Sequence, residues 1–340
     1  MSERWPGGIV RSTPVTPAGP YQNGAAPGVW SLADAAYWTK QGLWPIAGNV
    51  ADGTFAIFAL GFTTTRVATR NKYTYAGCVV GSATAATQAS YCGSAAGNST
   101  AGIFALGYTT TYTSTRDKYT YSGCVVSAGG AATAASSQGY ATGNSTVGIF
   151  ALGCTSTPSS TRNKYTYSGD VVSAGTAATA VSVGGSAAGN STVGIFALGY
   201  TSGYARTTTR DKYTYAGCVV SAGGAATALS ASGSAAGNST VGIFALGVNN
   251  SFVATTTRDK YTYAGCVVSA GGAATAASSA GSAAGNSTVG IFALGSVGCT
   301  ASSTRNRYTY SGDVVSAGGA ATTLSRSGSA ASNGTIGVNI

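Results

Sequence analysis

One repeated phrase constrains the fold of this chain more than any other feature. Ile-Phe-Ala-Leu-Gly occurs six times, beginning at Ile57, Ile103, Ile149, Ile195, Ile243 and Ile291, at steps of 46 or 48 residues. Each copy leads through a Thr/Ser-rich loop to Arg-[Asn/Asp]-[Lys/Arg]-Tyr-Thr-Tyr and then to a Val-Val pair. Self-similarity at a period of this length is typical of architectures in which each repeat is one supersecondary unit.

Each unit contains four short segments of β-branched and aromatic or small residues, separated by Gly, Asn and Ser clusters. This pattern is typical of short antiparallel strands. In the second unit we expect strands at 93–97, 101–106, 116–121 and 124–133. Four strands in about 46 residues is the period of a propeller blade, and a first strand of Gly, Ala and Ser suits a crowded axis. The sequence therefore predicts an all-β fold, a β-propeller of four-stranded blades spanning residues 46–340.

The number of blades depends on which element is counted. The Tyr-Thr-Tyr strand occurs six times, whereas seven asparagines occupy the expected hairpin turn: Asn49, Asn98, Asn144, Asn190, Asn238, Asn286 and Asn333. We therefore expect seven blades, with six as the alternative count. In the seven-bladed interpretation the chain end supplies two inner strands, and extended N-terminal chain, 8–15, completes the last blade.

Residues 1–45 have a different composition from the repeats. They hold six of the seven prolines and all four tryptophans, Trp5, Trp30, Trp38 and Trp44. Ser31, followed three residues later by Asp34, predicts the start of one short helix that ends near Gln41. A segment too short for a core of its own must dock, either on a partner or on its own propeller. The four tryptophans are the candidate docking residues.

The composition leaves little material for catalysis. The chain has no His and eight acidic residues, and Asp170 and Asp313 lie in well-separated repeats, so neither an acid/base pair nor a metal site is expected. We predict a protein that is not an enzyme and that has no cofactor. The net charge of +10 comes mostly from the repeated Arg-x-Lys pair, which argues against nucleic-acid binding. No apolar run approaches the length of a membrane span, so no membrane insertion is expected.

The cysteines do not form a disulfide framework. Four of the seven, Cys78, Cys124, Cys218 and Cys266, share one repeat position that Asp170 and Asp313 occupy in the other units. A position that accepts either Cys or Asp is not a bridge position. We expect reduced thiols, with Cys78 and Cys92 as the one candidate pair.

The Arg-x-Lys-Tyr-Thr-Tyr strand should divide its side chains between two faces. Alternation places both tyrosines and the x residue on one face, and Arg, Lys and Thr on the other. We expect the tyrosines to pack between blades, and Arg70 and its equivalents to bond carbonyls of the next sheet. A ring of positive charge could also attract an acidic glycan or phosphate, but a residue repeated in every unit more simply maintains every unit.

The loops between the second and third strands differ from unit to unit, although the strands are almost copies. These loops should emerge on one face of the ring, together with the links between blades. Exposed aromatic, Arg and Asn side chains there are suited to stacking on sugars or anchoring a partner. Drift in solvated loops is the alternative explanation. The candidate binding residues are Phe62, Arg66, Tyr108, Tyr112, Tyr200, Tyr204, Arg206, Asn249, Asn250 and Phe252.

Two resemblances follow from these motifs. The block from Gly-Ser-Ala-Ala-Gly-Asn through Ile-Phe-Ala-Leu-Gly to Tyr-Thr-Tyr resembles a degenerate kelch-type blade, although it has Ala-Leu-Gly in place of a Gly pair and lacks the later Trp. The segment 4–9, Arg-Trp-Pro-Gly-Gly-Ile, is similar to the N-terminal segment of structural proteins from tailed bacteriophages. Gly-Val-Trp-Ser-Leu at 28–32 and Gly-Leu-Trp-Pro at 42–45 belong to the same resemblance.

The second resemblance implies a virion protein of the tail fibre, tail adhesin or capsid-decorating type. Such a protein assembles in the host cytoplasm and leaves by lysis. Residues 1–45 would attach to other virion proteins, and the propeller would bind a host-surface glycan or neighbouring subunits, with a homo-oligomer as one arrangement. A lectin-like carbohydrate-binding propeller outside any virion is the alternative.

Overall fold

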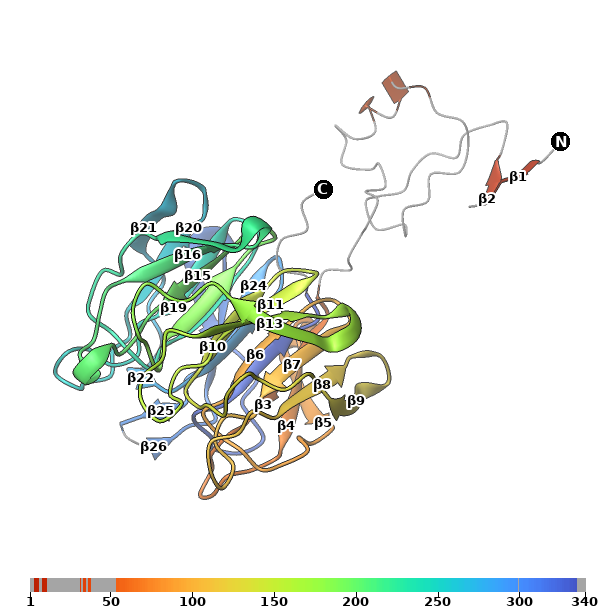
Figure 1. Ribbon diagram of the computed structural model, residues 1–340. Helices are drawn as coiled ribbons and strands as arrows, with labels where there is room; N and C mark the ends of the chain where they lie inside the picture. The colour runs from red at the N-terminus through yellow and green to blue at the C-terminus, as the bar shows by residue number, and fades with distance from the viewer. Residues whose placement is uncertain are drawn as a thin grey trace. The chain divides into compact units, whose positions relative to one another are not determined.

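The computed structural model of the chain describes residues 53–298 and 300–334 in its larger part (Figure 1). In the N-terminal part it describes Glu3–Trp5, Gly8–Val10, Ser31, 33–34 and 36–37. The chain divides into two compact units between residues 51 and 52.

The larger unit is a β-propeller with six four-stranded antiparallel blades. From the innermost to the outermost strand, blade 1 contains β29 (Ser329–Ser332), β3 (Phe55–Ala59), β4 (Arg70–Thr74) and β5 (Val79–Ala83); blade 2 contains β6 (Ser94–Gly97), β7 (Ala101–Ala105), β8 (Arg116–Thr120) and β9 (Val125–Ala128); and blade 3 contains β10 (Tyr140–Gly143), β11 (Val147–Ala151), β12 (Arg162–Thr166) and β13 (Val171–Gly175). Blade 4 contains β14 (Ser186–Gly189), β15 (Val193–Ala197), β16 (Arg210–Thr214) and β17 (Val219–Ala222); blade 5 contains β18 (Ser234–Gly237), β19 (Val241–Ala245), β20 (Arg258–Thr262) and β21 (Val267–Ala270); and blade 6 contains β23 (Ser282–Gly285), β24 (Val289–Ala293), β27 (Arg305–Thr309) and β28 (Val314–Ala317). The predicted β-propeller of four-stranded blades is confirmed.

The C-terminal strand β29 closes the ring by completing blade 1. It pairs with β3, with Ser329 opposite Ala59 and Ser332 opposite Ala56. The Asn333 side-chain oxygen accepts the N–H of Phe55 at 2.9 Å. In blade 2 the Asn98 oxygen accepts the equivalent N–H of Ala101, also at 2.9 Å. Asn333 therefore serves the corner of a blade whose other strands lie near the start of the repeats.

Closure by β29 corrects two expectations. The blade count is six and not seven, because the turn at Asn333 belongs to the blade of β3, whose second and third strands the repeat count already includes. Asn49 lies outside the described residues. The expected closure by 8–15 is also wrong, because β2 (Gly8–Val10) pairs with β1 (Glu3–Trp5) in a separate two-stranded sheet.

The predicted helix start is present in the N-terminal unit. Ser31 Oγ accepts the N–H of Asp34 and donates to its carboxylate, which satisfies a backbone donor of the first turn. The described residues 33–34 and 36–37 are helical. The expected end near Gln41 lies outside the described residues.

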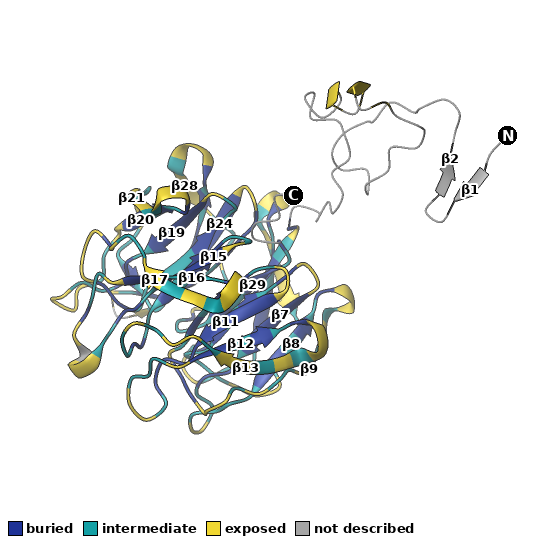
Figure 2. Cartoon of the chain, turned by 45° about the horizontal axis from the view of Figure 1, so that its top comes forward, coloured by how far each residue is buried: buried dark blue, intermediate teal, exposed yellow. Residues whose placement is uncertain are grey.

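The hydrophobic core is distributed between neighbouring blades. Between blades 2 and 3, for example, Ile103 packs with Phe150, Tyr165 and Tyr167, all of them buried. Ile103 and the tyrosines thus lie on opposite faces of their own sheets, as the strand alternation predicts. Buried residues occupy the inner strands, whereas the outer strands and turns are largely exposed (Figure 2).

A buried guanidinium joins each blade to the next. Arg70 Nη2 in blade 1 donates to the Asp117 carboxylate in blade 2 at 2.8 Å, and both side chains are 0% exposed. The carboxylate also accepts the hydroxyl and N–H of Thr87, and the guanidinium lies 4.6 Å from the centroid of Phe104. Arg70 also donates to a carbonyl, that of Ala85, but this carbonyl follows its own blade. The expected bond to carbonyls of the next sheet is therefore a side-chain bond.

This contact recurs between every pair of neighbouring blades and so forms a closed ring. The six pairs are Arg70–Asp117, Arg116–Asn163, Arg162–Asp211, Arg210–Asp259, Arg258–Asn306 and Arg305–Asn71. The last pair joins blade 6 to blade 1. We call this set the arginine ring.

Three partners in the arginine ring are Asn and three are Asp. Where the partner is Asn, burial lowers the pKa of the arginine to about 10, as for Arg116 beside Asn163. Burial also lowers the pKa of Arg70, but the Asp117 carboxylate opposes that shift. The ring therefore tolerates a neutral acceptor, provided that one is present.

The position shared by Cys and Asp ends the short 3-10 turn after each third strand. These turns are η1 (Ala76–Cys78), η2 (Ser122–Cys124), η3 (Ser168–Asp170), η5 (Ala216–Cys218), η6 (Ala264–Cys266) and η7 (Ser311–Asp313). Asp170 accepts Lys118 Nζ of the preceding blade at 2.9 Å, and Lys164 Nζ lies 3.8 Å from Cys218 Sγ. Carboxylate and thiol thus face the same lysine position. The described cysteines are all free.

We expect Asp117→Ala to destabilise the propeller by about 3–5 kcal/mol, because it leaves the buried Arg70 charge without an acceptor. Asp117→Asn reproduces the pair that Arg116 and Asn163 form naturally, so the expected loss is only about 1–2 kcal/mol. Unfolding in urea at neutral pH measures both values. Equal losses for the two variants would contradict this account of the ring.

We expect removal of residues 329–340 to unfold the propeller, because β3 loses its inner partner and the ring opens between blades 6 and 1. The loss should exceed about 5 kcal/mol, the lower end of the free energy that keeps a domain folded. Removal of 335–340 alone keeps β29 and is the matched control. Thermal unfolding followed by circular dichroism distinguishes them, and a cooperative transition in the longer deletion would refute closure by β29.

Candidate binding face

The variable loops and the links between blades lie on one face of the propeller, as expected. The loop between β7 and β8 pairs with the link before β6 through a bridge between Tyr108 and Tyr91. The same kind of bridge joins Phe62 with Arg326 and Cys154 with Ser137, and β22 (Ser278–Ser279), β25 (Ser296–Val297) and β26 (Thr300–Ala301) form a small sheet there. The loop face comprises the loops 60–69, 106–115, 152–161, 198–209, 246–257 and 294–304 with these links; within it, Cys299 lies outside the described residues.

The opposite face carries the Asn hairpin turns. Asn98 Oδ1 accepts the N–H groups of Thr100 and Ala101, while its Nδ2 donates to the Ser145 carbonyl of the next blade at 3.0 Å. Equivalent bonds run from Asn144, Asn190, Asn238 and Asn286. These asparagines hold the turns and neighbouring blades together, so turn chemistry accounts for the repeated Asn-Ser-Thr.

Two groups of side chains on the loop face combine arginine with aromatic rings. In the first, which we call the Phe62 cluster, Arg326 lies 5.2 Å from the centroid of Phe62 and Arg66 lies 5.8 Å from that of Tyr108. Tyr91 stands between them, 5.6 Å from Phe62 and 5.3 Å from Tyr108. Arg66 also donates to the Thr109 carbonyl. Tyr112 extends the cluster, 5.7 Å from Tyr108.

The second group, the Arg206 cluster, connects blades 4 and 5. The Arg206 guanidinium lies 3.9 Å from the centroid of Phe252 and 5.0 Å from that of Tyr200. Its nitrogens donate to the Asn250 carbonyl and the Tyr200 hydroxyl, both at 3.4 Å. Arg206 is 7% exposed, whereas Phe252 is 75% exposed and has a positive φ of 61°. The buried arginine thus supports an aromatic ring that faces solvent.

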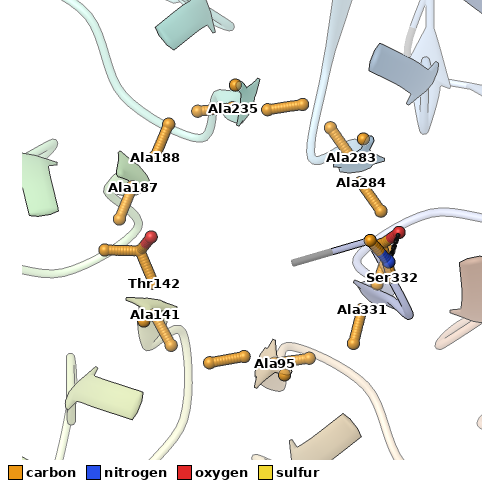
Figure 3. A pocket seen from close by; sticks show the side chains of 18 residues that line it. Ala95, Ala141, Thr142, Ala187, Ala188, Ala235, Ala283, Ala284, Ala331 and Ser332 are labelled. Atoms are coloured by element: carbon orange, nitrogen blue, oxygen red, sulfur yellow. Dashed lines mark hydrogen bonds between the residues drawn. The ribbon is translucent and has the colours of Figure 1, made fainter. Parts of the chain in front are cut away.

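The inner strands surround a narrow channel, and only small side chains reach it (Figure 3). Alanines of all six inner strands line a cavity of about 50 Å³ near the hairpin turns. This observation confirms the expectation that only small residues fit near the axis.

A closed circle of six backbone hydrogen bonds surrounds the channel on the loop face. The residue before each inner strand donates its N–H to the equivalent carbonyl of the preceding blade, as Gln138 does to Cys92 at 2.7 Å. All six have a left-handed conformation, with φ between 52° and 62°: Cys92, Gln138, Gly184, Ser232, Ala280 and Ser327. They line a cavity of about 170 Å³ together with Tyr200, so the channel mouth adjoins the Arg206 cluster.

Burial controls the two titratable groups at this mouth. It raises the pKa of the Cys92 thiol, so the group is a protonated thiol at neutral pH and a weak nucleophile. Burial also raises the pKa of Tyr91, which Arg66 partly opposes.

The structure brings most of the predicted binding residues into the two clusters. Asn249 is an exception, because its side-chain oxygen accepts the N–H groups of Ser251 and Val253 and holds its own loop. The backbone of Tyr204 lies in η4 (Ser202–Tyr204), but its side chain lies outside the described residues. The same holds for the side chain of Trp5 in β1, and Trp30, Trp38 and Trp44 lie outside the described residues entirely.

Sequence reasoning missed Tyr91, Arg326 and the circle at the channel mouth. All of them lie in the links between blades, where the comparison of repeats was not applied. The circle position is Cys, Gln, Gly, Ser, Ala and Ser in successive units. Comparing the units residue by residue in the links would have found it.

No family model matches the chain, and no curated protein is significantly similar to it. In the part of the chain that the structure describes, no helix is long and apolar enough to cross a membrane. The described residues also contain no group of three His, Cys, Asp or Glu side chains suited to a metal ion.

Proposed function

We propose that this chain is a non-enzymatic virion structural protein that attaches to a phage particle through residues 1–45 and displays its propeller for binding a host-surface glycan. One observation carries the binding part of the proposal. Variation among nearly identical blades is concentrated on the loop face, where it yields two arginine–aromatic clusters. A rigid scaffold that presents different loops at one end is a common basis for recognition.

The direction of the strands supports a division of labour between the two faces. Strand β3 runs from the hairpin turns, next to Gly53, toward the loop face, and β29 returns to Gly334 beside Gly53. Both ends of the propeller therefore leave from the face opposite the loops. A device joined to these ends leaves the loop face open to a receptor.

The attachment role rests on the resemblance of residues 1–45 to N-terminal segments of phage structural proteins. It also accounts for four tryptophans in a segment too short to bury them in a core of its own. Assembly in the host cytoplasm fits the free thiols of the described cysteines.

Two variants test the proposal on phage particles. Deletion of residues 1–45 should leave a folded propeller that binds host cells but is absent from particles, because the ring closes without that segment. Phe252→Ser should enter particles normally and reduce adsorption at least about tenfold, the effect of removing one aromatic anchor. Mass spectrometry of purified particles and an adsorption assay provide the readouts.

The opposite pattern would refute the proposal. Incorporation of the deleted protein at the normal level would remove the attachment role. Unchanged adsorption of the Phe252→Ser particles, together with unchanged adsorption after removal of Tyr108 by Tyr108→Ser, would remove the receptor role of the loop face.

A further inference from the structure

We infer that the ligand of the loop face is an acidic polysaccharide, one that carries carboxylate or sulfate groups. This inference rests on the function proposed above and specifies the chemistry of its ligand. It depends on where the positive charges of the chain are accessible.

The repeated basic residues do not supply this charge. The six arginines of the arginine ring are each 1% exposed. Among the motif lysines, Lys118 and Lys260 pair with Asp170 and Asp313 on the outer part of the blades. The conserved-looking ring of charge is therefore part of the scaffold.

The loop face has positive charges of its own that no acid neutralises. Arg66, Arg206 and Arg326 lie there, and the loops and links between blades contain no Asp or Glu in the printed sequence. Among the described residues, none of these three arginines forms an ion pair. The two clusters thus present three cations and no anion.

Arg206 is the least satisfied of the three. It is 7% exposed, and its buried Nε has no hydrogen-bond partner. Its other bonds, to the Asn250 carbonyl and the Tyr200 hydroxyl, are long at 3.4 Å. A buried guanidinium without a carboxylate is destabilising, and an anion bound beside it would offset that penalty.

The chemistry of the clusters favours an acidic sugar over a neutral one. Neutral sugars offer mainly hydroxyl groups, and the strongest side-chain acceptors for hydroxyls are the carboxylates that this face lacks. Arginine instead matches carboxylate and sulfate oxygens with its planar fork. Exposed Phe252 supplies the apolar surface on which a sugar ring stacks.

A nucleic acid fits less well. Its affinity comes mainly from many phosphate contacts along a basic groove, whereas the described loop face offers three arginines divided between two clusters. A glycan that places one acidic group at a time beside an aromatic ring suits this arrangement.

Titration calorimetry of the full chain with polygalacturonate, neutral dextran of equal length and a short DNA duplex tests the inference. Polygalacturonate should bind, and more than about tenfold more weakly when salt rises from about 0.05 to about 0.5 M. The double variant Arg66→Gln/Arg326→Gln should lose at least about tenfold in affinity. The control Lys212→Gln/Arg307→Gln removes the same charge from outward-facing third strands and should lose less than about twofold.

Each other outcome overturns the inference in a distinguishable way. Dextran binding as tight as polygalacturonate would overturn it and leave a neutral-glycan function. Equal losses in the two double variants, or DNA binding as tight as polygalacturonate, would show attraction by net charge alone. Binding of none of the three polymers, combined with the unchanged adsorption described above, would remove the proposed function as well.

Discussion

The buried contact between an arginine of one blade and an Asp or Asn of the next is the interaction on which the rest of this structure depends. Each guanidinium lies against a Phe of the neighbouring blade and donates to an acceptor that a Thr also holds, as Arg70 does with Phe104, Asp117 and Thr87. Removing one partner would strand a charge in the core. The motif therefore recurs in all six blades with only Asp and Asn exchanged.

This constraint separates the parts of the chain that must be uniform from those that are free to vary. The second and third strands carry the ring and the interblade core, so their sequences are nearly identical. The loops beyond them, such as those of Phe62 and Arg206, contact the links and each other, and their differences leave the ring untouched. Aromatic and basic residues can accumulate on the loop face without a loss of packing between blades.

Much of the fold followed from the sequence because each signal was local. Strand alternation in Arg-x-Lys-Tyr-Thr-Tyr predicted which side chains face each neighbour, and the repeat length predicted the blade. The closure was not predictable in the same way, because β29 and β3 pair across almost the whole chain and Asn333 reads as one more hairpin. The candidate loops were identified from their variation, whereas Tyr91 and Arg326 became visible only when the links were seen beside those loops.

Differential scanning calorimetry of the full chain tests most directly whether the arginine ring joins the blades into one unit. If it does, the propeller unfolds in a single transition whose calorimetric and van't Hoff enthalpies agree, because no blade can leave without exposing a buried guanidinium. A calorimetric enthalpy several times the van't Hoff value, which means that the blades unfold in separate steps, would contradict the account.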